Sequence, residues 1–254
     1  MNNGLWTSVK DNVVFVLVSV GIAAALFAIA YLAEKLIKRK NGDTERILST
    51  RKIAMIGVFS AISAVLMLFE FPVPFAPSFY ELDFSEIPAL IGTFAFGPVA
   101  GVMIEFCKIL LKLLMKGTST AFVGDLANFV IGCSFILPAS IIYLFKKTKK
   151  NAIIASITGT LIMSVFGTMF NAIYLLPAFA SLYGMPLDVI VGMGTAINSS
   201  ITSVTTLVIF AVAPLNLLKG GSVSLVTILV YKKLSIILKE ATISKKSKAV
   251  EASK

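Results

Sequence analysis

The chain has 254 residues, of which 57% are hydrophobic and 14% are charged, and its mean hydropathy is +0.92. Soluble domains carry about 45–50% apolar and about 25% charged residues, so this composition indicates an integral membrane protein. The absence of histidine excludes His general bases, Ser–His triads and the commonest metal ligand. Cys107 and Cys133 lie in apolar stretches without metal-ligand spacing, and we expect both to be reduced and buried.

The net charge of +10 is concentrated in a few places. Of the 23 lysine and arginine residues, 18 lie in the segments 35–52, 146–150 and 232–254, each of which separates or follows apolar runs. Such clustering is typical of cytoplasmic loops in membrane proteins. The charge therefore favours a lipid bilayer, rather than a nucleic acid, as the surroundings of this chain.

The first apolar run, Val13–Ala33, has 21 residues and is long enough to cross about 30 Å of hydrocarbon as a helix. We interpret it as an uncleaved membrane helix, because cleavage as a signal peptide would export the basic segment 35–52. The second run is Ile53–Phe69. The stretch Glu70–Glu86 contains three prolines, four acidic residues and no Lys or Arg, which suits the outer face. Ile87–Phe96 is too short to span as a straight helix and is expected to be buried within the protein.

The rest of the chain continues the alternation of spans and loops. The predicted spans are Val99–Met115, Phe122–Phe145, Ile153–Leu176 and Val204–Tyr231. Pro177–Ser203 is interpreted as an external loop with room for a surface helix, and the last span is expected to be broken near Pro214 and Gly220-Gly221. These elements predict an all-α membrane protein with three parts: an extra N-terminal transmembrane helix and basic linker at 1–49, a six-helix substrate-binding membrane domain at 50–239, and a basic cytoplasmic tail at 240–254. This arrangement places the N-terminus outside and the C-terminus in the cytoplasm.

Three polar residues lie within predicted membrane spans, where polar groups are costly and are often functional. They are Asn171, Asn216 and Lys219, and the last two share one helix face because they are three residues apart. Two amides and an ammonium can together offer donors and acceptors to the polar edge of a planar ligand. A structural hydrogen-bond network, with Lys219 reaching for the membrane surface, is the alternative.

A second polar stripe lies on the predicted span Val99–Met115 and just beyond it: Glu105, Lys108, Lys112 and Lys116. An internal ion pair between Glu105 and Lys108 is expected, with Lys116 reaching the outer interface. Asp125 and Asn128 open the next span and either face the same cavity or, for Asp125, cap the helix. Outer aromatic residues fit either the membrane interface or stacking on a flat ring: Phe75, Phe79, Tyr80, Phe84, Tyr174, Phe179 and Tyr183.

Small residues recur at helical spacing on the span that begins at Ile53: Gly57, Ser60, Ala61 and Ala64. In lipid, such a face lets another helix approach closely. That helix belongs either to this chain or to a partner subunit. The chain contains no Gly-rich G-x-x-x-x-G-K-[ST] loop for binding nucleotide phosphates, so ATP-driven transport would need an ATPase on another chain.

Several of these stretches together resemble riboflavin-specific S components of energy-coupling factor (ECF) vitamin transporters. They are LDFSEIPAL at 82–90, TFAFGPVAG at 93–101, Ala127-Asn128-Phe129 with Gly132, the Asn171-x-x-Tyr174-Leu175-Leu176-Pro177 motif, and PLNLLKG at 214–220. The resemblance covers about residues 50–239. The Val13–Ala33 helix lies outside it, and the spacing from Asn171 to Asn216 is longer than in the family, which points to extra residues within 178–203.

The resemblance implies a six-helix S-component fold in a cell membrane of a Gram-positive bacterium. It implies a non-enzymatic subunit that binds riboflavin with high affinity at the outer face, with FMN left open as cargo, and that consumes no cofactor. ATP-dependent uptake would need a transmembrane T subunit, docked on Gly57, Ser60, Ala61 and Ala64, and two ATP-binding subunits. The flavin-binding residues implied are Asn171, Asn216 and Lys219, together with Asn128, Asp83 and Tyr174. No catalytic residue and no metal site are expected.

Four alternatives remain at this point. The chain could be an S component for another small vitamin or a self-contained secondary transporter driven by an ion gradient. An intramembrane enzyme is disfavoured by the lack of histidine and of a nucleophile–base pair. In a structural membrane subunit without a ligand, Asn171, Asn216 and Lys219 would only hold helices together.

Overall fold

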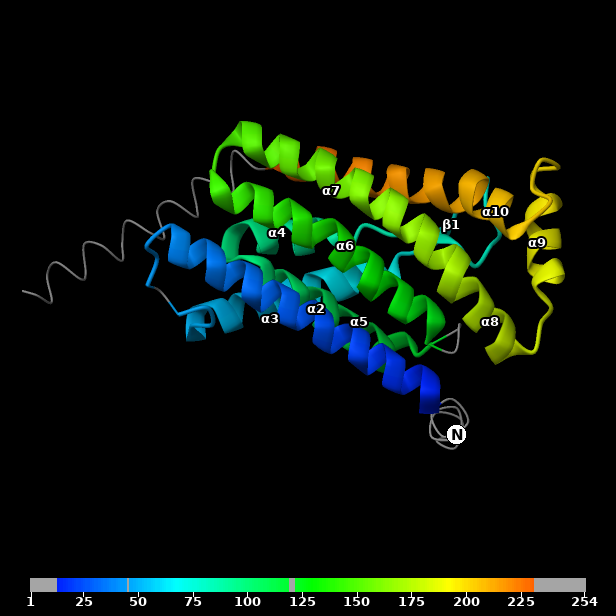
Figure 1. The fold of residues 1–254 in the computed structure, drawn as a ribbon, viewed down its shortest axis with the longest axis horizontal. Coiled ribbons are helices and arrows are strands. Elements are labelled where there is room, and N and C mark those ends of the chain that lie inside the picture. The colour runs from blue at the N-terminus through cyan, green and yellow to red at the C-terminus, as the bar shows by residue number, and fades with distance from the viewer. Residues whose placement is uncertain (1–12, 45, 119–121, 231–254) are drawn as a thin grey trace, which may run out of the picture.

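Long apolar runs form helices along most of the chain (Figure 1). The computed structural model describes residues 13–44, 46–118 and 122–230, so the tail predicted at 240–254 lies outside the described residues. Within them, five helices are long and apolar enough to cross a membrane: Leu17–Lys40, Thr50–Leu68, Val123–Phe145, Lys149–Tyr183 and Val204–Val230. This agrees with the prediction of a multi-pass helical membrane protein.

The first half of the chain supplies five helices: α2 (Val13–Lys40), α3 (Thr50–Leu68), α4 (Glu86–Phe96), α5 (Pro98–Lys116) and α6 (Val123–Phe145). As predicted, the apolar segment before Gly97 is short, because Gly97 and Pro98 separate α4 from α5. Between α3 and α4 lies a small antiparallel hairpin of β1 (Phe71–Pro72) and β2 (Glu81–Leu82).

The second half begins with α7 (Lys149–Phe170), whose helical path continues through the π-helical turn η1 (Asn171–Leu175) into α8 (Leu176–Tyr183). The expectation that an external loop starts at Pro177 was wrong. Pro177 lies in α8 two residues after η1, and the π turn accommodates the backbone N–H that proline lacks within a continuing helix. The surface helix for which that segment had room is α9 (Leu187–Thr195).

The last span also differs from the prediction. It begins with α10 (Val204–Leu207), passes through a second π-helical turn, η2 (Val208–Val212), and is helical from 213 to 230. The irregularity expected near Pro214 is therefore a π turn, and the break expected at Gly220-Gly221 does not occur. Packing on α7, where Thr160 and Ser224 share a hydrogen bond of 3.1 Å, keeps this stretch helical despite the low helix propensity of glycine.

The two ends of the bundle differ in character (Figure 1). One end, which we call the basic end, holds Lys38, Arg39 and Lys40 of α2 and the turn at 146–150 between α6 and α7. The opposite end, which we call the hairpin end, holds the β1–β2 hairpin, α8 and α9. This separation follows from the positions of the basic segments along alternating helices.

Helix α2 is the additional N-terminal helix, and it packs against α5 and α6. Its Glu34 is only 2% exposed, accepts a hydrogen bond from the backbone N–H of Val99 (3.1 Å), and pairs with Nζ of Lys52 (3.3 Å). The carboxylate thus supplies a partner for an N–H group in the first turn of α5, where helical partners are missing. Phe27 and Phe106 add an edge-to-face ring contact at 5.7 Å.

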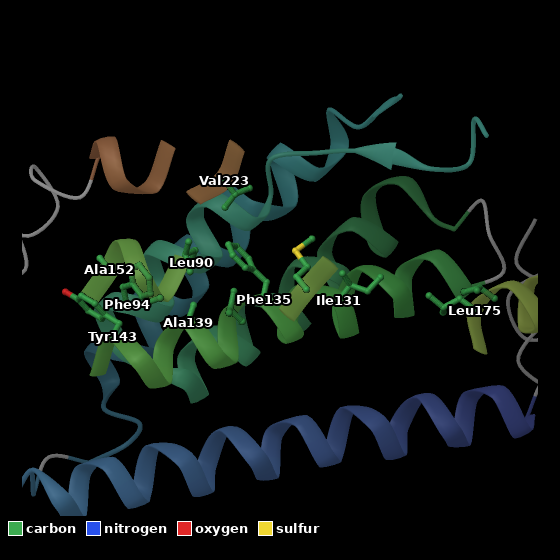
Figure 2. Packing of buried hydrophobic residues seen from close by; sticks show 13 residues of the cluster. Leu90, Phe94, Ile131, Phe135, Ala139, Tyr143, Ala152, Leu175 and Val223 are labelled. Atoms are coloured by element: carbon green, nitrogen blue, oxygen red, sulfur yellow. The ribbon is translucent and has the colours of Figure 1, made fainter. Parts of the chain in front are cut away.

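Figure 2 shows one hydrophobic cluster of the bundle, spread along α6. Phe135 is fully buried, and the rings of Tyr143 and Phe94 lie 4.5 Å apart between α6 and α4. A separate apolar cluster near the hairpin end joins the 73–82 segment to α9 and η2 through residues such as Val73, Leu82 and Ile190. The hairpin is therefore packed onto the helices next to the site described below.

Candidate substrate-binding site

A cavity opens between the hairpin segment, α6, the α7–η1–α8 helix and the last helix. The space open to the centre of a water molecule is about 130 Å³. Its walls combine apolar and polar side chains. The polar lining residues are Glu70, Tyr80, Glu81, Glu86, Lys112, Asn128, Asn171, Asn216 and Lys219, and the larger apolar ones include Phe79, Ile131, Met163, Leu175, Leu176, Phe179 and Leu215.

Asn171 is positioned by the first π turn. It follows the last residue of α7, and its Nδ2 donates to the carbonyl of Gly167 at 2.9 Å. Its Oδ1 accepts from the hydroxyl of Tyr80 at 3.1 Å. Because Tyr80 lies in the hairpin segment, this bond joins the segment to the helices. Burial raises the pKa of the Tyr80 hydroxyl, so this group stays a proton donor.

Asn216 carries a polar group that is unpaired within the described part of the chain. The side chain is 5% exposed, and its Nδ2 has no hydrogen-bond partner among the described residues. The amide packs directly over Gly167, where an added Cβ atom would come within 2.6 Å of Nδ2. A buried donor left unpaired costs about 1–3 kcal/mol, which an acceptor on a bound ligand would recover.

Lys219 lies one turn beyond Asn216 and also faces the cavity. Its Nζ donates to Oδ2 of Asp83 at 2.9 Å and to Oδ1 of Asn128 at 3.3 Å, and it lies 3.5 Å from Oε1 of Glu86. Burial alone would raise the pKa of Asp83, but the neighbouring ammonium groups of Lys219 and Lys108 lower it to about 2. Asp83 therefore stays charged, and it holds Lys219 from behind rather than lining the cavity.

A buried ionic network supports this wall of the cavity. Lys108 is fully buried and contacts Glu105 at 2.6 Å and Glu86 at 2.8 Å, which confirms the predicted Glu105–Lys108 ion pair. Lys112 pairs with Asp125 at 2.8 Å. Such pairs fix the orientation of the helices because separating either partner would leave an uncompensated buried charge.

The structure brings four of the predicted substrate-binding residues, Asn128, Asn171, Asn216 and Lys219, to one cavity. Tyr174 is not among the lining residues; its ring stacks on Phe170 at a centroid distance of 5.5 Å.

The sequence did not single out Tyr80 or Phe79, although both belong to the outer aromatic group named above. The ring of Phe79 stacks on that of Phe179 of α8 at 5.5 Å, so the hairpin segment forms a cover over the cavity. The extended 69–85 segment gave no periodic signal from which this inward position could have been read.

The small-residue face of α3 is divided between outside and inside. Gly57 and Ala61 are exposed on the surface of the bundle. Ser60 and Ala64 are at most 1% exposed and face the interior. The outward part of the predicted partner interface is therefore formed by Gly57 and Ala61.

A membrane-embedded helical bundle with a covered, partly polar cavity at one end defines a membrane protein that binds a small ligand. Residues 51–231 match the family model of the ECF transporter substrate-specific component, and the chain belongs to this family. Family membership confirms the predicted S-component fold and a transport protein in place of an enzyme. Helix α2 lies outside the matched residues.

Similar proteins agree with this assignment. The chain is 36% identical over 189 residues to riboflavin transporter RibU of Staphylococcus aureus, covering 74% of this chain and 93% of that protein. It is 32% identical over 190 residues to riboflavin transporter FmnP of Bacillus subtilis, with the same coverages. A solved structure described as the S component of a bacterial ECF transporter matches with a TM-score of 0.58 and 35% identity, covering 74% of this chain and 98% of that one.

Proposed function

We propose that this chain binds riboflavin as the S subunit of an ECF importer. The observation that carries the proposal is the unpaired Nδ2 of Asn216, placed in a cavity beside Asn171 and Lys219. The isoalloxazine ring of riboflavin has carbonyl oxygens and ring nitrogens along one edge, and these groups complement amides and an ammonium. The proteins RibU and FmnP, both called riboflavin transporters, support the same ligand.

The polar and the apolar residues of the cavity bind different parts of the isoalloxazine ring. Asn216, Asn171 and Lys219 bind the polar edge of the ring, and Asn128 and Asp83 keep Lys219 in place. Apolar side chains, among them Ile131 and Phe179, bury the ring faces. The Tyr80–Asn171 hydrogen bond must lengthen or rearrange if Asn171 turns its oxygen to the ligand.

Uptake requires partner subunits in this proposal. A transmembrane T subunit docks on the outward face of α3 around Gly57 and Ala61, with Ser60 and Ala64 supporting that face from within, and two ATP-binding subunits supply the energy. The basic end faces the cytoplasm and the cavity faces the outside of a Gram-positive cell, with the N-terminus outside and the C-terminus inside.

An absorbance spectrum of the detergent-purified protein, produced in medium with riboflavin, tests the proposal. We expect a flavin spectrum at about one flavin per chain, released on denaturation. A colourless protein that also fails to bind added riboflavin would contradict the proposal, and binding of another vitamin would then reassign the substrate. Uptake without ATPase subunits, dependent on an ion gradient, would instead identify a secondary transporter.

A further inference from the structure

One end of the cavity is acidic and open to water. Glu70 and Glu81 both line it, where α3 ends and β2 begins. Glu70 pairs with Lys116, whose side chain is 48% exposed, so solvent reaches this part of the cavity. Burial, and then the nearby carboxylate of Glu70, raise the pKa of Glu81, as expected for two acids that share a small space. We call Glu70 and Glu81 the mouth acids.

Charges around the cavity do not balance. Three carboxyl groups lie around the mouth of the cavity, on Glu70, Glu81 and Asp125. Two ammonium groups oppose them, on Lys112 and Lys116. Both lysines already contact a carboxylate, so the described residues at the mouth offer no uncommitted cation to a bound anion.

The direction in which riboflavin enters follows from the two ends of the cavity. The unpaired amide of Asn216, with Lys219, lies at the buried end, since both residues are at most 6% exposed. The ring edge must reach this end to form its hydrogen bonds. The polyhydroxyl chain of riboflavin, which is well solvated, then points toward the mouth acids and water.

We infer that the mouth acids select riboflavin against its phosphorylated form, FMN, by repelling the phosphate at the end of that chain. This inference rests on the proposed function, because it assumes that the ring occupies the amide end. A phosphate monoester carries about −1.5 to −2 charges at neutral pH. In a partly dehydrated mouth with an excess of carboxylates, that charge is unfavourable, whereas the neutral hydroxyl of riboflavin can donate a hydrogen bond to Glu81.

Dissociation constants for riboflavin and FMN, measured by flavin fluorescence quenching on the full chain in detergent at low salt, test this inference. We expect FMN to bind at least about tenfold more weakly than riboflavin. Glu81→Gln should lower the ratio of the FMN dissociation constant to the riboflavin dissociation constant by about threefold or more. Glu70→Gln should lower this ratio further, because the substitution also frees Lys116 to bind the phosphate. Asp188→Asn, an equal charge change at an exposed residue of α9 outside the cavity, should leave the ratio unchanged.

Two further measurements separate charge from size. Riboflavin acetylated at its terminal hydroxyl is longer but neutral, and we expect it to bind more tightly than FMN. The FMN penalty should also shrink as salt increases, because the mouth is reached by solvent. Equal affinity for riboflavin and FMN, or an acetylated ligand as weak as FMN, would overturn the inference. Failure to bind riboflavin at all would instead overturn the proposed function.

Discussion

At the residue scale, Asn216 presents a buried N–H₂ group that nothing in the described protein accepts. Replacing it with Ala removes the ligand hydrogen bond and should weaken riboflavin binding by about 1–3 kcal/mol. Because the unpaired donor also disappears, the ligand-free protein should not lose stability. Isothermal titration gives the affinity and thermal unfolding gives the stability. Asn41→Ala, the same change at an exposed residue away from the cavity, is the control and should alter neither quantity.

The second prediction concerns the ion pair of Lys219 and Asp83, which links riboflavin binding to the stability of the protein. Lys219→Met should abolish much of the affinity and also destabilise the protein by about 3–5 kcal/mol, because Asp83 is left buried without its partner. Adding Asp83→Asn should restore stability but not riboflavin binding. Recovery of binding in the double variant would show that Lys219 does not contact the ligand. A double-mutant cycle on unfolding and binding separates the two effects.

The membrane environment explains why part of this site was predictable at the residue scale. Asn171, Asn216 and Lys219 stood out because polar groups within apolar spans are costly, and the structure gathers all three at one cavity. Tyr80 and Glu81 lie in a segment without periodicity, where the sequence indicates exposure to water but not which side chains turn inward. Tyr174 shares a π turn with Asn171, yet the helical phase there directs its ring onto Phe170.

At the scale of elements, two π turns lie next to two of the three amides that line the cavity, Asn171 and Asn216. Asn171 begins η1, and η2 ends two residues before Pro214. A π turn adds a residue to a helical turn and so rotates everything that follows it. The sequence signalled the second irregularity through Pro214 but predicted a break, because a proline indicates a disturbed hydrogen-bond ladder without specifying its form. The first irregularity carries the same kind of signal, because Pro177 follows the end of η1 by two residues, but the sequence analysis assigned Pro177 to the start of an external loop.

Helix α2 supports a prediction at this scale. Glu34 bonds the first turn of α5 and pairs with Lys52 of α3, so it joins three helices at the basic end. Glu34→Ala should lower the stability of the protein by about 1–3 kcal/mol. In thermal unfolding, the midpoint Tm should fall by about 2–4 °C for each kcal/mol of stability that is lost. Glu34→Gln keeps an acceptor for the backbone N–H of Val99, so this variant should lose less stability than Glu34→Ala. Riboflavin affinity should stay the same, because the cavity lies at the opposite end of α5; a large loss of affinity would show that the two ends are coupled.

For the whole molecule, the separation of the basic end from the hairpin end decides how the bundle inserts. Lys147 lies at the basic end and Asp188 lies on α9 at the hairpin end, and both are exposed. The positive-inside rule therefore predicts that Lys147 faces the cytoplasm and that Asp188, with the cavity, faces the outside. The same rule gave the predicted topology from the sequence, because the basic segments follow the first, fifth and seventh apolar segments, so that an even number of segments separates each basic segment from the next.

Single-cysteine labelling checks this orientation in intact cells. Cys133 is fully buried, so only Cys107 needs replacement, by Ser, before the new cysteines are introduced. A membrane-impermeant maleimide should label Asp188→Cys in intact cells, whereas Lys147→Cys should react only after the membrane is opened with detergent. The detergent step serves as the control, because both variants should then be labelled. Labelling of Lys147→Cys in intact cells would place the basic end outside, and the cavity could then not capture its ligand from the medium.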